Sequence, residues 1–177
     1  YYLALSHYYL GDKEKAKVIG KKVDSYNSSR RDIDAHITQE ALDMIGGDPG
    51  LQKLKSTVLF NPQWHKGVIG IVASRLIDTW YRPTVILTES NGFATGSARS
   101  VFGFDLYQAV DSCSDLLENF GGHKYAAGLT LKIENIPKFQ KRFEEIVAES
   151  ITPDQMIPVV EIDTEIAKII QKYPIAD

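Results

Sequence analysis

Between residues 56 and 150, short apolar runs alternate with stretches whose apolar residues recur every three or four positions. Thr57–Phe60 and Thr84–Thr88 are typical of strands, and the second is apolar enough for a strand buried on both faces. Between them, the spacing of Val68, Ile71, Val72 and Leu76 predicts an amphipathic helix that ends near Trp80. This alternation predicts an α/β fold in which helices flank a mixed β-sheet.

The same pattern continues toward residue 150. Phe93–Ser100 and residues 127–133 are expected to be strands. Asp105 suits the N-cap of a helix that would run to about residue 118 and bury Cys113, and Pro137 suits the first turn of a later helix.

The N-terminal part is expected to be helical. Four apolar residues at a spacing of four lie on one helix face: Ile33, Ile37, Ala41 and Ile45. Glycines and a proline then end that helix, so we expect a helical linker over 1–50 and the main domain over 51–150. Thr152-Pro153 marks a boundary, after which 151–177 would begin another unit with a strand over 157–162. Because residue 1 is Tyr, we expect a piece of a longer protein.

Composition limits the kinds of partner. The chain has 20 basic and 23 acidic residues and a net charge of −3, so any site for an anion must be local. A single cysteine excludes an internal disulfide and a cysteine-rich zinc site, and no apolar run approaches the ~20 residues of a membrane span. The four histidines lack ligand spacing, which predicts no complete metal site. We expect a cytoplasmic protein.

Gly96-Ser97-Ala98-Arg99-Ser100 is the first candidate site. Two hydroxyls and a guanidinium, Ser97, Ser100 and Arg99, can converge on one phosphate, because the planar guanidinium binds such groups with two hydrogen bonds. The alternative is an edge strand with an exposed arginine.

Gly121-Gly122-His123-Lys124 is the second candidate. Glycines allow a ligand to approach the backbone, and His123 can donate a hydrogen bond to a phosphoryl oxygen. The alternative is a helix C-cap at Gly121. A third candidate, His65-Lys66-Gly67, precedes a helix whose N-terminus can bind phosphate, although Gly70 in that helix equally suggests close packing.

The amino-acid sequences of these stretches resemble those of a known family. "WHKGVIGIVASRLIDTWYRPTVILTE", "GSARSVFGFDLYQAV" and "LLENFGGHKYAAGLTL" are similar, in order and approximate spacing, to the DHHA1 substrate-binding domain of the DHH phosphoesterases. The resemblance is strongest to the RecJ family of 5′→3′ single-stranded-DNA exonucleases. "YNSSRRDIDAHITQEALDMI" also resembles the linking helix of that family, and the resemblance covers residues 24 to 150.

The resemblance implies roles for particular residues. His123, on the Gly121-Gly122 loop, would contact the phosphate being cleaved. Ser97 and Arg99 would hold nucleic-acid phosphates, including the 5′-terminal one, with Ser100, Lys124 and Arg30 as further contacts. His65 matches a family position of undefined role. Ala98 departs from the glycine that is usual in the family.

The resemblance also implies what this chain lacks. RecJ-type enzymes cleave DNA with two Mn²⁺ or Mg²⁺ ions held by an N-terminal domain that carries an Asp-His-His run, and no such run is present here. Single-stranded DNA and that domain, in cis, are the expected partners, and the chain alone is expected to be inactive. Residues 151–177 resemble the start of an OB-type domain. The alternatives are a phosphodiesterase of short oligonucleotides or cyclic dinucleotides, and a nucleic-acid-binding appendage without hydrolysis.

Overall fold

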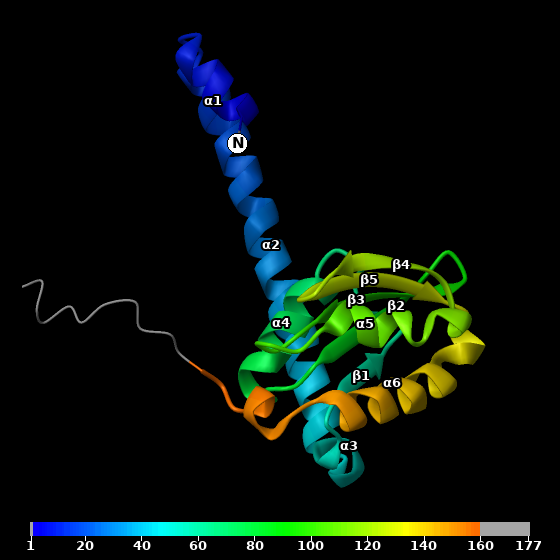
Figure 1. Cartoon of the computed structure of the whole chain (residues 1–177). Coiled ribbons are helices and arrows are strands. Elements are labelled where there is room, and N and C mark those ends of the chain that lie inside the picture. Colours follow the sequence, from blue (N-terminus) through cyan, green and yellow to red (C-terminus); the bar gives the residue numbers. More distant parts are fainter. Residues whose placement is uncertain (1, 160–177) are drawn as a thin grey trace, which may run out of the picture.

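A five-stranded sheet in the order β1-β2-β3-β5-β4 is the centre of the computed structural model, which describes residues 2–159 (Figure 1). The strands are β1 (Thr57–Phe60), β2 (Thr84–Ser90), β3 (Phe93–Arg99), β4 (Leu117–His123) and β5 (Ala126–Leu131). The α-helices are α1 (Tyr2–Tyr9), α2 (Lys13–Gly46), α3 (Pro49–Lys53), α4 (Ile69–Thr79), α5 (Leu106–Asp111) and α6 (Ile136–Ser150). Short 3-10 turns occupy Ser114–Leu116, Ile133–Asn135 and Pro153–Met156.

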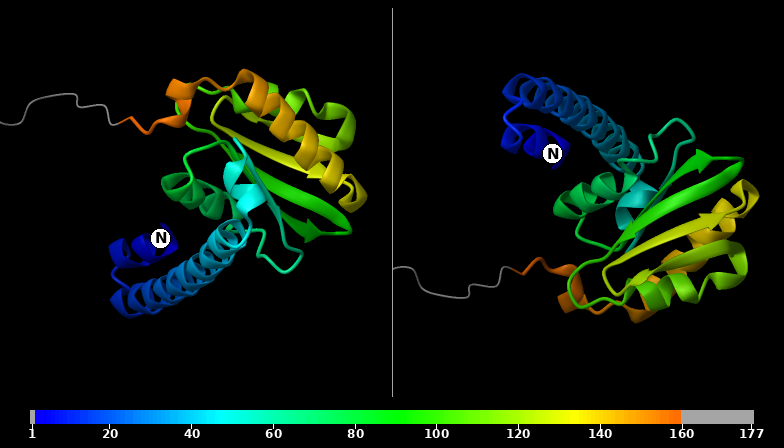
Figure 2. Two further views of the ribbon diagram at one scale, coloured as in Figure 1. Left: turned by 90° about the horizontal axis from the view of Figure 1, so that it is seen from below. Right: turned by 90° about the horizontal axis from the view of Figure 1, so that it is seen from above.

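The sheet is mixed. β1 and β2 are parallel and are joined through α4, whereas every other neighbouring pair is antiparallel. Helices α2 and α4 lie on one side of the sheet, and α5 and α6 lie on the other (Figure 2). The predicted fold, a mixed sheet flanked by helices and preceded by a long helix, is therefore confirmed.

Two hydrophobic clusters hold these layers together. The cluster on the α4 side joins Ile37 and Ala41 of α2 to Val72 and Leu76 of α4 and to Ile86 of β2. The larger cluster fills the opposite side and includes the stacked rings of the α6 phenylalanines, which are both fully buried. Because both faces of β2 are covered, its apolar run is explained by burial on two sides.

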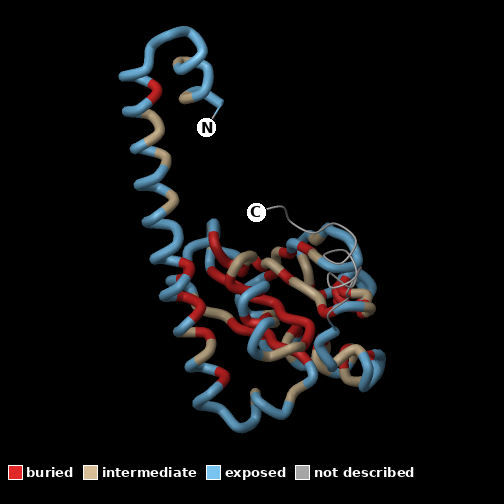
Figure 3. Tube along the Cα trace, turned by 90° about the vertical axis from the view of Figure 1, so that its left-hand side faces the viewer, coloured by how far each residue is buried: buried red, intermediate tan, exposed pale blue. Residues whose placement is uncertain are grey.

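Helix α2 is anchored to the domain by only part of its length. Its buried positions fall near residue 34 and beyond, apart from Ala16, and the tube in Figure 3 is mostly exposed before that point. On the buried face, Asp34 takes the place expected for Ile33, which is exposed. The Asp34 carboxylate is paired with the Arg75 guanidinium of α4 at 2.8 Å, which compensates the burial of its charge. No helix in the described residues is long and apolar enough to cross a bilayer.

The helix predicted from Asp105 to about residue 118 is shorter than expected. Asp105 is its N-cap, as predicted, and accepts a hydrogen bond from the Gln108 amide at 3.1 Å. The α-helix ends at Asp111, however, and Leu117 begins β4, a strand that the apolar spacing did not predict. Pairing with β5 explains the difference, since this edge strand is stabilised by a partner distant from the helix signal.

The Gly121-Gly122-His123 segment is therefore neither the open loop nor the helix C-cap considered from sequence, because it forms the end of β4. β5 is also shifted relative to the strand expected over 127–133, and Ile133 begins a 3-10 turn. The strand expected over 157–162 and the remainder of the segment to residue 177 lie largely outside the described residues.

Arg82 joins the beginnings of β1 and β2. Its guanidinium is buried and donates hydrogen bonds to the Thr57 hydroxyl at 2.7 Å and to the Gln52 carbonyl at 3.3 Å. Burial lowers the pKa of Arg82, and the nearby Glu144 carboxylate opposes that effect. Glu144 in turn accepts hydrogen bonds from the backbone amides of Lys55 and Ser56, which joins α6 to the segment that leads into β1.

Cys113 is fully buried, as predicted, and burial raises the pKa of its thiol to about 11. Since the thiolate is the reactive form, we expect Cys113 in the native chain to react with Ellman's reagent about 100-fold more slowly at pH 8 than in urea. The measurement is the rate of absorbance increase in each condition. Equal rates would show that this part of the core opens readily.

Candidate nucleic-acid interface

Strand β3 sends its residues alternately to the two sides of the sheet. Ala94, Gly96 and Ala98 point into the larger hydrophobic cluster and are buried. Ser97 and Arg99 point to the side of α4 and are half-buried. The predicted site residues Ser97 and Arg99 therefore share one face.

The register of the sheet brings the two glycine-containing candidates together. Ser97 is opposite Gly128 of β5, which is opposite Gly121 of β4. In the next row, Arg99 is opposite Ala126, which is opposite His123. Residues directly opposite in antiparallel strands point to the same face, and two strand spacings separate β3 from β4 by about 10 Å.

We call this surface the open face. It comprises three rows of three residues: Thr95, Thr130 and Asn119; Ser97, Gly128 and Gly121; Arg99, Ala126 and His123. All nine are polar or small, and none carries a carboxylate. Helix α4 packs over β2 and β3 and so covers the β3 part of this surface. Gly128 of β5 and Gly121 and His123 of β4 are exposed.

The two consecutive glycines of β4 have different structural roles. A Cβ atom added at Gly121 would meet no atom within 4 Å, so the absence of a side chain leaves the backbone of the open face bare. A Cβ atom at Gly122 would lie only 2.3 Å from the Ala126 carbonyl oxygen and 2.6 Å from the Ala127 Cα. Gly122 is therefore required by the hairpin, whereas Gly121 is not required by any neighbour within the described part of the chain.

Arg99 is folded back along its own strand. Its Nη1 donates hydrogen bonds to the Ser97 hydroxyl at 3.0 Å and to the Ala98 carbonyl at 2.8 Å. These contacts hold the guanidinium beside Ser97 and leave it further donors, because a guanidinium carries five N–H groups. Arg99 and Ser97 thus form a pair of donors on the open face.

His123 ends the row that contains Arg99. The backbone amide of Tyr125 donates a hydrogen bond to its Nδ1 at 3.4 Å, which leaves Nε2 as the nitrogen able to donate to a ligand. The tip of the β4–β5 hairpin is held by two further contacts, from the Ser100 amide to the Tyr125 carbonyl at 3.1 Å and from the Leu106 amide to the Lys124 carbonyl at 3.0 Å. This support fixes the backbone that carries His123.

Ser100 and Lys124 lie beside the open face and are not part of its rows. The Ser100 hydroxyl donates to the Phe104 carbonyl at 3.0 Å and so stabilises the loop after β3. The Lys124 ammonium lies 5.6 Å from the centre of the exposed Tyr125 ring. The structure therefore brings together Ser97, Arg99, Gly121 and His123, with Ser100 and Lys124 at the margin.

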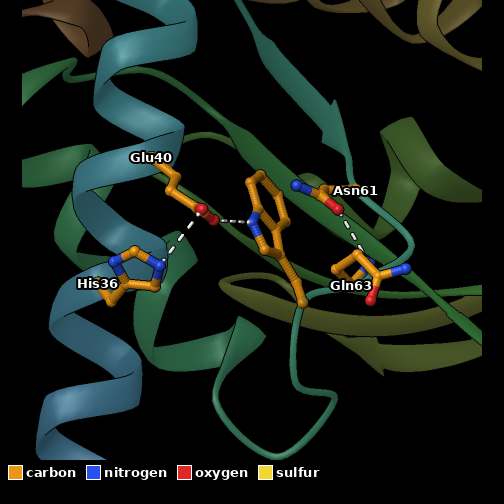
Figure 4. A network of polar contacts seen from close by, with 5 residues as sticks. His36, Glu40, Asn61 and Gln63 are labelled. Atoms are coloured by element: carbon orange, nitrogen blue, oxygen red, sulfur yellow. Dashed lines mark hydrogen bonds and ion pairs between the residues drawn. The ribbon is translucent and has the colours of Figure 1, made fainter.

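His65 is located on the turn that leads into α4. Its Nδ1 accepts a hydrogen bond from the Gly67 amide at 3.0 Å. The neighbouring Trp64 is buried, and its Nε1 donates to Glu40 of α2 at 2.8 Å. Glu40 also lies 3.4 Å from the Nε2 of His36 (Figure 4). This network fixes the turn against α2, and within residues 2–159 no hydrogen bond joins His65 to the open face.

Arg30 remains separate from these strands. It is exposed on α2, one turn before Asp34 on the same side of the helix, and no ion pair or hydrogen bond in the described part of the chain joins it to the open face. Three polar residues of the face, Thr95, Asn119 and Thr130, were not identified from sequence. The alternation of side chains along β3 and β5 could have placed Thr95 and Thr130 on this face. Asn119 could not be placed in this way, because its position depends on the register of β4.

The described residues do not provide a metal site. No group of three or more His, Cys, Asp or Glu side chains between residues 2 and 159 is arranged to hold an ion. The open face offers one imidazole and no carboxylate, a set that does not fit Mg²⁺ or Mn²⁺. The face suits an anion instead.

Comparison with known proteins identifies the family of the domain that carries the sheet. The family model of the DHHA1 domain matches residues 52–149, which include the whole sheet. The chain is 40% identical over 154 residues to the single-stranded-DNA-specific exonuclease RecJ of Bacillus subtilis and 35% identical over 166 residues to RecJ of Dickeya dadantii. These alignments cover 86% and 88% of this chain but only 19% and 28% of the relatives, so the chain spans less than a third of their length.

Solved structures show the same similarity. RecJ from Thermus thermophilus, in complex with Mg²⁺, matches 80% of this chain with a TM-score of 0.71 and 31% identity, over 22% of its own length. An exonuclease RecJ bound to manganese matches 84% of this chain with a TM-score of 0.72 and 29% identity, over 36% of its length. With the family model spanning its entire sheet, this chain belongs to the DHHA1 domain family and is a homologue of the corresponding region of the RecJ exonucleases.

Proposed function

We propose that this chain is the substrate-binding part of a RecJ-like 5′→3′ exonuclease and that its open face holds the phosphates of single-stranded DNA. The observation that carries the proposal is the row Arg99, Ala126 and His123, which puts a guanidinium and an imidazole on one face of one sheet. The similarity of this chain to single-stranded-DNA-specific exonucleases supports single-stranded DNA as the polymer that these groups would bind.

Each group has a distinct role in this proposal. Arg99 and Ser97 donate hydrogen bonds to a phosphate, and the charge of the guanidinium makes these bonds stronger than neutral ones. Gly121 and Gly128 allow the DNA backbone to lie close to the sheet. His123 donates from Nε2 to the phosphoryl group under attack and stabilises the negative charge that develops there. Ser100, Lys124, Arg30 and His65 are peripheral contacts.

Cleavage itself requires groups that the described residues do not supply. Mn²⁺ or Mg²⁺, bound by an upstream domain of the DHH type, would activate the attacking water. We therefore propose that residues 1–50 link that domain to the DHHA1 domain at 51–150, that 151–177 lead into an OB-type domain, and that the protein acts in the cytoplasm. On this view the chain alone binds DNA without cutting it.

Replacing Arg99 tests recognition of the terminal phosphate. Arg99→Ala should weaken binding of a 5′-phosphorylated oligonucleotide roughly 5- to 70-fold, because a charge-assisted hydrogen bond to a half-buried group contributes about 1–2.5 kcal/mol. Fluorescence anisotropy with 5′-phosphorylated and 5′-hydroxyl oligonucleotides measures the effect. Equal losses for the two oligonucleotides would argue against recognition of the terminal phosphate, and no loss for either would reject the proposed site.

Replacing His123 tests its part in cleavage. In a protein that includes the metal-binding domain, His123→Ala should slow nucleotide release about 10²- to 10³-fold, the usual cost of removing one donor to a developing negative charge. DNA affinity should change much less. The measurement is single-turnover cleavage with Mn²⁺, with Arg99→Ala as the comparison. A variant that loses affinity but cleaves bound DNA at the normal rate would show that His123 only binds.

The two glycines of β4 provide a matched pair. Gly122→Ala should lower the free energy of unfolding by about 1–3 kcal/mol, because its methyl group collides with backbone atoms. Gly121→Ala should leave stability within about 0.5 kcal/mol of the wild type but weaken DNA binding roughly fivefold, because its methyl group projects where the DNA backbone would lie. Urea unfolding and anisotropy measure the two quantities. Normal DNA binding by Gly121→Ala would place the nucleic acid elsewhere.

A further inference from the structure

Gly70 lies against Arg99 and Ser97, the pair of donors on the β3 part of the open face. It lies in the first turn of α4, where the helix crosses β3. A Cβ atom added at Gly70 would lie 2.9 Å from Nη2 of Arg99 and 2.9 Å from the hydroxyl oxygen of Ser97. The guanidinium of Arg99 and the hydroxyl of Ser97 therefore occupy the space that a side chain at residue 70 would fill.

The helix itself has no need of a glycine at this position. Gly70 has no positive φ angle, and glycine inside a helix is less favourable than alanine. The atoms that a methyl group would meet are the ends of side chains and not backbone atoms. The chain can therefore accommodate alanine without moving α4 or β3, provided that Arg99 and Ser97 move.

We propose that Gly70 is a positioning residue: the absence of a side chain at residue 70 leaves the space in which the Arg99 guanidinium lies beside Ser97, so that both can bind one phosphate. The inference rests on the proposed function of Arg99 and Ser97. It assigns α4 a second role, because the helix that covers β2 and β3 also limits where the guanidinium can lie. A methyl group at residue 70 would displace both donors from their mutual hydrogen bond of 3.0 Å.

The test compares Gly70→Ala with Gly20→Ala in the same chain. Gly20 is also a helical glycine, and a Cβ atom there would meet nothing within 4 Å, so it controls for the change in helix propensity. Both variants should melt at or a few degrees above the wild-type temperature. Only Gly70→Ala should bind a 5′-phosphorylated oligonucleotide roughly 5- to 10-fold more weakly, because a small displacement of positioned groups has large effects.

A third measurement shows whether Gly70 acts through Arg99. Added to Arg99→Ala, the Gly70→Ala change should cause much less than its own loss of affinity, because the guanidinium is already absent and only the Ser97 hydroxyl can still be displaced. Normal binding by Gly70→Ala, additive losses in the double variant, or a melting temperature well below that of the wild type would each overturn the inference. The proposed function is judged separately, by whether Arg99→Ala itself binds DNA normally.

Discussion

The alternation of strand β3 is the constraint on which both the core and the candidate site depend. Its core side carries only Ala94, Gly96 and Ala98, and a Cβ atom at Gly96 would lie 2.5 Å from a methyl carbon of Leu87. Larger residues of the neighbouring strands therefore fill the space that β3 leaves. Such packing tolerates little shift in register, because sliding the strand by one residue would exchange its two faces. The same register points Ser97 and Arg99 toward the open face.

Much of the fold could be predicted because its signals are local. β1, β2, β3, α4 and α6 follow from apolar periodicity, and the N-cap of α5 from one aspartate. β4 could not be predicted in this way. Its Gly121 and Gly122 contribute no side chains to a periodic pattern, Leu117 continued the helical spacing of the preceding segment, and the pairing with β5 that stabilises the strand depends on the folded sheet.

The candidate site shows the same division between local and non-local information. The sequence identified Ser97, Arg99 and His123 as residues able to bind an anion, but their common face depends on the order of β3, β5 and β4. In the sequence, Gly70 indicates only close packing, and its contact with Arg99 requires α4 to cross β3 at one position. Arg75 of α4 is paired with the buried Asp34 of α2, and no local pattern in the sequence indicates that pairing. Tertiary contacts determine each of these outcomes.

The charge of the open face bears on how strongly it can bind. It presents one guanidinium and one imidazole within a chain whose net charge is −3, so few counterions would be released when a DNA strand binds there. With one or two phosphates neutralised, the dependence of affinity on salt should be shallow, with a slope of about −0.7 per phosphate. On the proposed function, the open face would therefore orient a phosphate as one wall of a cleft, and a second surface facing it would supply most of the attraction for DNA.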